Sequence, residues 1–221
     1  DASNLIPADM RFPDILMKRD AANVLQLIIE KLSAEKSIIP VSGYRTLREQ
    51  TDIYFTSLKD NGEDFTQKYV ALPDHSEHQT GLAIDLGLKK ESIDFIRPDF
   101  PYIGICQQFR EKSVPYGFIE LYPREKEHIT GIAHEPWHFR YVGTPHAEIM
   151  REHHFCLEEY IDFLKRFSQD QPYTFYKDSQ EIQIFYLKAD TESVSLEVTE
   201  DGSLSVSGNN VDGYIITEWR G

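Results

Sequence analysis

The pattern of apolar and polar positions predicts several helices within the first 168 residues. One helix is expected to begin after Thr46, because Thr46 and Glu49 have the spacing of a capping box, and to end near residues 61–62. Further helices are predicted over residues 103–112 and from Leu157 to Phe167. Another is predicted to begin with Thr144 as its N-cap and Pro145 at its first helical position. The first helix shows the clearest apolar stripe, made of Ala21, Val24, Leu25, Ile28 and Leu32.

Short strands are expected between these helices. Residues 37–42 form an apolar run in which Pro40 indicates an edge strand or a strand end. Residues 82–88 alternate, so that Ile84 and Leu86 share one face while Asp85 lies on the other. Residues 117–119 and 137–142 are two more candidates. The mixture predicts an α+β fold, a small antiparallel sheet with flanking helices.

The composition changes after residue 168. Residues 169–172 resemble a linker, and the chain then alternates with period two in segments separated by turn signals such as Asp201-Gly202. We therefore expect two domains, a main domain over 1–168 and a small antiparallel β appendage over 172–221. The pattern leaves open whether the appendage packs on the main domain or binds a ligand. The predicted appendage strands are residues 173–176, 181–188, 194–199, 204–207 and 214–219.

The charge balance excludes some partners. Asp and Glu number 37 against 23 Lys and Arg, a formal net charge of −14. Nonspecific binding to nucleic acid or to an anionic membrane is therefore disfavoured. No apolar run approaches the ~20 residues of a membrane-spanning helix. The chain begins at Asp1 rather than Met, which leaves a removed leader or anchor open, and a cytoplasmic location is the expectation.

Cys106 and Cys156 are too few for a disulfide framework. Each lies in an apolar segment, which favours buried thiols over a single bridge or a reactive thiol.

Two clusters of polar residues carry the candidate chemistry. One spans residues 76–85 and the other residues 134–141. A catalytic zinc needs three protein ligands and an open position for water, and His78, Asp85 and His138 would supply them. Asp85 interrupts an apolar strand, so its charge needs a partner, which a metal or an arginine could provide. Gly81 permits a sharp turn that would return His78 to the side of Asp85.

Glu135 precedes His138 by three residues. A carboxylate beside a metal site can take a proton from water and pass it to a leaving amine. In a regular strand positions 135 and 138 would face opposite ways, but Pro136 makes regular pairing unlikely, and a bend would turn both inward. Taken alone, Glu135 could equally be a surface acid.

Together these motifs resemble a known family. Ser-x-His-x-x-Gly-x-Ala-x-Asp over residues 76–85, Glu-x-x-His over 135–138 and Ser-Gly-Tyr-Arg over 42–45 are similar to the zinc D,D-peptidases of the VanX, VanY and VanXY group. The resemblance covers residues 4–168. The stretch from residues 6–9 through residues 76–81 looks closest to the VanXY type of the VanG vancomycin-resistance cluster.

The resemblance implies a role for each matching position. His78, Asp85 and His138 match the Zn²⁺ ligands, Glu135 the catalytic base, and Arg45 the arginine that stabilises the oxyanion. Ser76 and Gln50 match substrate-binding residues, with a turn serine and a solvated helix face as their alternatives. One departure is Asp74, which stands where many carboxypeptidase relatives have Gly; Asp tolerates the unusual backbone angles of such a turn, but its carboxylate could alter substrate access.

The expected function is zinc-dependent hydrolysis of D-alanyl-D-alanine and of the terminal D-alanine of peptidoglycan precursors, contributing to vancomycin resistance. The implied partners are small peptides ending in D-Ala-D-Ala. One alternative is an endopeptidase that cleaves inside the peptidoglycan stem. A second is a non-catalytic module with a structural zinc, which would need neither Glu135 nor Arg45.

Overall fold

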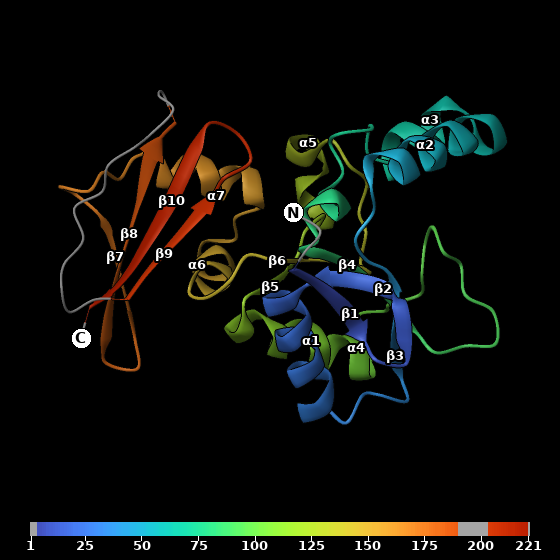
Figure 1. Cartoon of the computed structure of the whole chain (residues 1–221), viewed down its shortest axis with the longest axis horizontal. Coiled ribbons are helices and arrows are strands. Elements are labelled where there is room, and N and C mark those ends of the chain that lie inside the picture. The colour runs from blue at the N-terminus through green and yellow to red at the C-terminus, as the bar shows by residue number, and fades with distance from the viewer. Residues whose placement is uncertain (1–3, 190–202, 221) are drawn as a thin grey trace. The chain divides into compact units, whose positions relative to one another are not determined.

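The computed structural model describes residues 4–189 and 203–220, and the chain divides into two compact units, Asp1–Cys156 and Leu157–Gly221 (Figure 1). The first unit mixes helices with antiparallel strands, and the described part of the second combines one helix with an antiparallel sheet, which confirms the predicted fold class. Among the described residues, no helix has both the length and the hydropathy needed to cross a bilayer.

The first unit is built on one antiparallel sheet in the order β3-β4-β6-β5. The strand β3 lies at its edge, as Pro40 in that strand indicates. A separate hairpin, β1-β2, precedes the sheet. The strands and helices of the first unit are β1 (Leu5–Asp9), β2 (Phe12–Lys18), α1 (Arg19–Lys31), β3 (Ile38–Ser42), α2 (Leu47–Asn61), α3 (Glu63–Tyr69), β4 (Ala83–Leu88), α4 (Gly104–Ser113), β5 (Phe118–Glu120), α5 (Glu127–Thr130), β6 (His138–Tyr141) and α6 (His146–His153).

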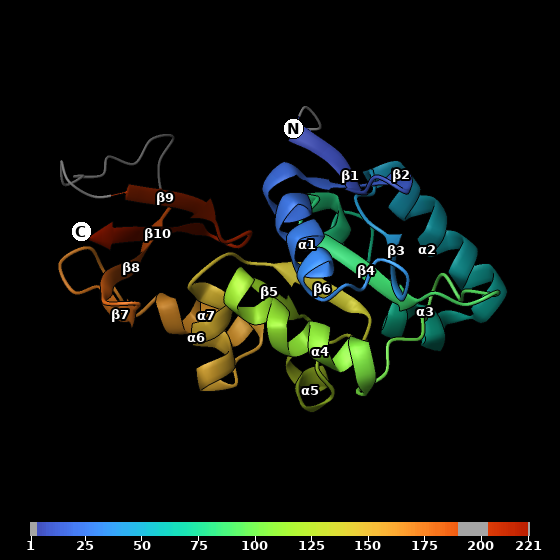
Figure 2. The same cartoon turned by 90° about the horizontal axis from the view of Figure 1, so that it is seen from below.

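The two faces of this sheet have different chemistry. Ile84 and Leu86 of β4 and Phe139 of β6 pack into a core formed with α1 and α4, which lie next to each other in Figure 2. Because side chains alternate along a strand, Asp85 and His138 project from the opposite face. The predicted segregation of Asp85 from Ile84 and Leu86 is confirmed, and the polar face is where the candidate site lies.

Local signals predict α1, α2, α4 and α6, whereas α3 and α5 are absent from the sequence-based prediction. The N-terminus of α2 has the full capping box between Thr46 and Glu49, and the C-cap is Gly62. The N-cap of α6 is Pro145 rather than Thr144, so the predicted threonine cap is wrong. Cys106 and Cys156 are both buried, as expected for core thiols.

The β1-β2 hairpin is absent from the sequence-based prediction, since Pro7 and Pro13 interrupt any alternation. It is held by long-range contacts. The Tyr44 N–H donates to the Leu16 carbonyl at 2.6 Å, and the Lys18 N–H donates to the Gly81 carbonyl at 2.7 Å. The hairpin thereby supports both loops that lead into the candidate site.

The second unit contains α7 (Leu157–Leu164) and a sheet in the order β7-β8-β10-β9, with β7 (Tyr173–Lys177), β8 (Gln180–Lys188), β9 (Ser203–Gly208) and β10 (Gly213–Arg220). The predicted strand over 194–199 and the turn at 201–202 lie outside the described residues. The structure groups α7 with these strands, whereas the sequence places it before the boundary at residue 168. The reason is aromatic packing: the ring centroids of Phe163 and Phe167 lie 5.2 and 5.3 Å from that of Tyr173.

Candidate active site

Asp85 and His138 form a directly opposed pair across β4 and β6. His138 Nδ1 lies 2.8 Å from Asp85 Oδ1, and both side chains are buried. Ser42 of β3 is the partner of Asp85 on the other side of β4, after an irregularity in the β3-β4 register. Sheet register therefore fixes two of the three predicted ligands without any loop contribution.

His78 reaches the same place from a short 3₁₀ turn, Glu77–Thr80. Gly81 ends this turn in the left-handed region at φ 71°, as its predicted role requires. A Cβ at Gly81 would lie only 3.0 Å from Leu5 Cδ2, so the turn packs closely on β1. His78 Nδ1–H donates to the Gly43 carbonyl at 2.7 Å, which orients the ring and leaves Nε2 facing Asp85.

The donor atoms of His78, Asp85 and His138 suit a metal ion. They all lie within 4.8 Å of one another. Burial lowers the pKa of His78 to about 4, so at neutral pH its Nε2 carries a lone pair. That atom lies 3.2 Å from Asp85 Oδ2, which is also an acceptor. Ligands bonded to a tetrahedral zinc at about 2.0–2.2 Å lie roughly 3.3 Å apart, so a cation between these atoms fits the spacing.

The environment keeps Asp85 ionised. Burial by itself would raise the pKa of Asp85, but attraction from His78 and His138 and the hydrogen bond from His138 Nδ1 hold it well below its usual range. Arg45 adds a further positive charge, with Nη2 3.6 Å from Asp85 Oδ2. Of the two partners weighed for Asp85, the structure shows the arginine, and the same carboxylate also belongs to the group of residues that could hold a metal ion.

Glu135 sits in a turn that leads into β6. The His138 N–H donates to the Glu135 carbonyl at 3.2 Å, which is the bend that Pro136 predicts. Glu135 is 6% exposed, so it is not a surface acid, and its Oε2 lies 3.8 Å from His138 Nδ1. Burial and repulsion from Asp85 raise the pKa of Glu135 to about 8, against the opposing charges of His138 and Arg45. A carboxyl with such a pKa can exchange a proton near neutral pH.

Arg45 and Gln50 are joined across the start of α2. Arg45 Nη1 donates to Gln50 Oε1 at 2.8 Å, and Gln50 Nε2 donates to the Ala71 carbonyl at 2.7 Å. Gln50 is fully buried, which rules out the solvated helix face. Burial lowers the pKa of Arg45, although Asp85 and Glu135 oppose that shift. Ser76 is also buried and begins the 3₁₀ turn without a side-chain capping bond.

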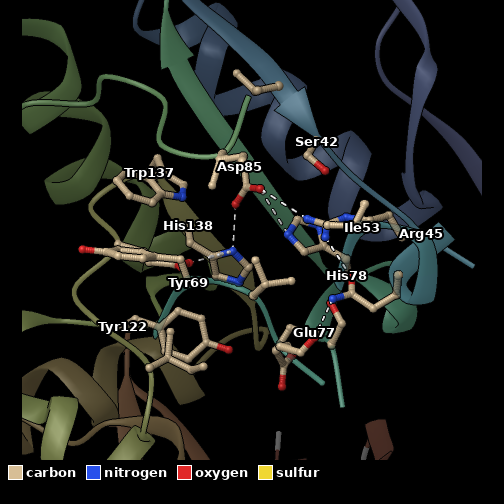
Figure 3. A pocket seen from close by; sticks show the side chains of 18 of the residues that line it. Ser42, Arg45, Ile53, Tyr69, Glu77, His78, Asp85, Tyr122, Trp137 and His138 are labelled. Atoms are coloured by element: carbon tan, nitrogen blue, oxygen red, sulfur yellow. Dashed lines mark hydrogen bonds and ion pairs between the residues drawn. The ribbon is translucent and has the colours of Figure 1, made fainter. Parts of the chain in front are cut away.

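All seven predicted site residues line one cavity of about 260 Å³ (Figure 3). In Figure 3 the rings of His78 and His138 approach the Asp85 carboxylate from two sides, and Arg45 lies beyond His78. The cavity also has an apolar wall that the sequence does not reveal, because loops and helices distant along the chain supply it. This wall includes Ile53, Tyr69, Phe95, Ile96, Tyr122, Ile132 and Trp137.

Sequence reasoning also missed an ion pair beside the ligands. Arg140, two residues after His138, pairs with Glu77, the residue before His78. Arg140 is buried, and burial lowers its pKa to about 10. The signal was available, since strand alternation puts Arg140 on the same face as His138. The pair links the two histidine-bearing segments.

Departure from the family pattern at Asp74 is tolerated. Asp74 adopts φ 69°, in the left-handed region that favours glycine. Its backbone N–H donates to Gln79 Oε1 at 3.0 Å, so the turn before Ser76 keeps a local restraint. The expected survival of this turn is confirmed.

Comparisons with known proteins agree with this geometry. The family model described as VanY, D-alanyl-D-alanine carboxypeptidase, matches residues 14–144. The chain is 44% identical over 162 residues to the bifunctional D-Ala-D-Ala dipeptidase and D-Ala-D-Ala carboxypeptidase VanXYC of Enterococcus gallinarum, covering 73% of this chain and 85% of that protein.

Two solved structures extend the comparison. The crystal structure of the vancomycin-resistance D,D-dipeptidase VanXYg with a D-Ala-D-Ala phosphinate analogue is 62% identical, with a TM-score of 0.95, and covers 99% of this chain and 87% of that one. A mutant of the vancomycin-resistance D,D-pentapeptidase VanY from a VanB-type cassette, in complex with Zn(II), is 29% identical with a TM-score of 0.59, and covers 73% and 92%. The resemblance to the VanX, VanY and VanXY group, and within it to the VanXY type, is confirmed. The chain belongs to the VanY family of D-alanyl-D-alanine carboxypeptidases.

Proposed function

We propose that this peptidase is a zinc-dependent D,D-dipeptidase and D,D-carboxypeptidase that removes D-alanine from D-alanyl-D-alanine and from peptides ending in it. The observation that carries the proposal is the convergence of His78, Asp85 and His138 beside the buried Glu135. Relatives that bind D-Ala-D-Ala analogues or hydrolyse D-Ala-D-Ala support the substrate class. By removing such precursors the protein would contribute to vancomycin resistance, and a cytoplasmic location stays a prediction.

His78, Asp85 and His138 would hold the zinc through one imidazole nitrogen each and a carboxylate oxygen. Bound there, zinc would supply a Lewis acid that polarises the scissile carbonyl and makes water acidic near neutral pH. A structural zinc has four protein ligands, whereas this group offers three, which suits a catalytic site. Within the described residues these three form the group that can hold a metal.

Glu135 would act as general base and then as general acid. It takes a proton from the attacking water as the oxygen adds to the carbonyl carbon of the substrate. It returns that proton to the amide nitrogen as the C–N bond breaks, so that D-alanine leaves with a neutral amine. The cation beside it would lower its pKa from about 8, because an opposite charge favours the carboxylate that accepts the proton.

Arg45 would stabilise the negative charge on the carbonyl oxygen in the tetrahedral intermediate. Its guanidinium is held by Gln50 and Asp85, so it is oriented before the charge develops. Gln50 would then act through Arg45, while Ser76 lies on the wall of the cavity, where a substrate could bind it.

The decisive experiment measures D-alanine release from D-alanyl-D-alanine and from a pentapeptide ending in D-Ala-D-Ala. We expect release from both, loss on treatment with a chelator and recovery when zinc is added back. A pentapeptide with an amidated C-terminus is the matched control, since a site that pairs the terminal carboxylate rejects the amide. Equal cleavage of the free and amidated peptides would favour the endopeptidase. Stoichiometric zinc without hydrolysis of any substrate would favour the non-catalytic module.

A further inference from the structure

Arg110, on α4 and outside the cavity, joins three separate segments of the chain. Its Nη2 donates to the carbonyls of Phe100 and Pro136, each at 2.6 Å, and its Nη1 donates to the Pro101 carbonyl at 2.8 Å. Its Nε donates to Glu120 Oε2 of β5 at 2.7 Å. The side chain of Arg110 is 9% exposed, so these bonds form with little competition from water.

Tyr102 extends this network to His134. Its hydroxyl donates to Glu120 Oε1 and lies 2.6 Å from His134 Nε2. The ring of Tyr102 also contacts two partners: Arg110 Cζ lies 3.9 Å from its centroid, and the centroid of the His134 ring lies 5.7 Å away with an interplanar angle of 16°. Arg110, Glu120, Tyr102 and His134 are hereafter called the Arg110 network.

The Arg110 network contacts the turn that contains Glu135 at the two residues on either side of Glu135. His134 is held through its imidazole, and Pro136 through its carbonyl. The backbone between them adds two bonds: the Glu135 N–H donates to the Tyr122 carbonyl at 3.1 Å, and the His138 N–H donates to the Glu135 carbonyl at 3.2 Å. Glu135 thus sits on a turn clamped at both neighbours from outside the cavity.

We propose that the Arg110 network positions the Glu135 carboxylate, and that Arg110 and Tyr102 are positioning residues for the general base. The inference rests on the proposed function, because it takes Glu135 as that base. A base must lie within hydrogen-bond reach of its proton, and a misplacement of about 1 Å can lower the rate about 10²-fold. Arginine suits the task because its planar fork donates in several fixed directions at once.

Tyr102→Phe is the mildest test, since it removes only the hydroxyl that joins His134 to Glu120. We expect kcat to fall about tenfold, with KM and zinc affinity unchanged, because neither a ligand nor a substrate contact is lost. Amide hydrogen exchange over residues 134–138 should become faster. The matched control is Tyr116→Phe, which removes a hydroxyl that bonds Lys31 Nζ at 2.7 Å elsewhere in the same unit and should leave all four quantities unchanged.

Arg110→Lys keeps the charge but not the fork, and we expect a fall in kcat of about 10²-fold with zinc retained. If this variant fails to fold, Tyr102→Phe still decides the matter. The sharper measurement combines Tyr102→Phe with Glu135→Gln. If Tyr102 acts through Glu135, the double variant should have the same kcat as Glu135→Gln alone, whereas a general structural role would lower it further.

Unchanged kcat and unchanged exchange over residues 134–138 in Tyr102→Phe would overturn the inference, as would a lower melting temperature with normal kcat. A wild type without chelator-sensitive D-alanine release would instead contradict the proposed function. In that case the exchange measurement still tests the clamp, because it needs no activity. Equal exchange over residues 134–138 in the wild type and Tyr102→Phe would then overturn the inference by itself.

Discussion

At the residue scale, the site brings four ionisable groups into one small buried space. Asp85 is ionised, Arg45 is cationic, His78 is held neutral by burial, and Glu135 prefers its proton until a cation arrives. These preferences follow from burial and from mutual charge rather than from residue type. They also predict that a zinc-loaded form would differ from the metal-free form in its protonation.

Glu135→Gln should separate metal binding from catalysis. Gln has nearly the same shape and hydrogen-bonds like the protonated carboxyl, so zinc should bind as in the wild type. Turnover of D-alanyl-D-alanine should fall by about 10²–10⁴-fold, the usual contribution of a general base. Zinc content measured by mass spectrometry and kcat measured on the same sample check this. His78→Ala, as the contrasting variant, should lose zinc and activity together, and near-normal turnover in zinc-loaded Glu135→Gln would place the base elsewhere.

The stability of the metal-free protein should depend on pH through Glu135. Its folded pKa of about 8 exceeds the ordinary value of 4.5, so between these values the folded state keeps a proton that the unfolded state has released. The free energy of unfolding should therefore fall as the pH rises through this window. His78 acts in the opposite direction, because its pKa is lowered to about 4 in the folded state. Between pH of about 4 and 6.5 the unfolded state binds a proton that the folded state does not, so the free energy of unfolding should rise with pH.

Above pH 6.5 the effect of Glu135 can be measured apart from that of His78. We expect the metal-free wild type to lose stability relative to metal-free Glu135→Gln as the pH rises from 6.5 to 8.5. Denaturant unfolding followed by Trp137 fluorescence, with Trp219→Phe in both proteins, reports on the unit that contains the site. Parallel stability curves for the two proteins would show that Glu135 has an ordinary pKa.

At the element scale, a small number of elements positions the residues of the site. The β4-β6 pairing places Asp85 opposite His138, and the start of α2 holds Arg45 against Gln50. A sheet register is rigid because a slip of one residue would turn every side chain to the other face. The helix start is less constrained, and its capping box is what fixes where α2 begins.

Thr46→Ala should lower the free energy of unfolding by about 1 kcal/mol, because it removes the side-chain acceptor for the Glu49 N–H. We also expect a higher KM or a lower kcat, since Arg45 precedes the cap directly. Chemical denaturation and steady-state kinetics measure the two effects. Thr51→Ala is the matched control: its hydroxyl donates to the Leu47 carbonyl within the helix, and its loss should be nearly neutral. Equal destabilisation by both substitutions would contradict a special role for the cap.

At the scale of the whole molecule, the chain separates into two compact units, and the family model matches residues of the first unit alone. The residues of the candidate site all belong to the first unit, and the family model ends at residue 144, before the second begins. The match to the VanXYg structure nevertheless covers 99% of the chain and so includes the second unit. The α7 helix and the β7-β8-β10-β9 sheet are therefore shared with a VanXY-type relative.

Zinc should stabilise the first unit in preference to the second. A ligand that binds only the folded state adds about 2.7 kcal/mol when present at 100 times its dissociation constant. Hydrogen exchange with and without zinc should therefore show slower exchange in the core around Asp85 and His138, with little change in β8 and β10. Equal slowing in both units would show that they unfold together. His78→Ala supplies the control, since zinc should then protect neither.

The sequence by itself determined the local features of this protein. The sequence shows the capping box of α2, the apolar stripe of α1 and the alternation around Asp85. It also shows the spacing of His78, Asp85, Glu135 and His138. Helix caps and strand alternation arise from hydrogen bonds and side-chain directions within a few residues. The zinc-peptidase motifs are local as well, which is why they indicated the family.

Only the tertiary structure decided the features that depend on residues far apart. The burial of Glu135 and Gln50 depends on segments that are far apart in the sequence. So do the orientation of His78 by the Gly43 carbonyl and the hydrogen bond from Arg110 to the Pro136 carbonyl. The β1-β2 hairpin and the placement of α7 in the second unit belong to the same class. The physical reason is that burial and pKa are set by whatever packs around a group, and that packing is known only once the whole chain has folded.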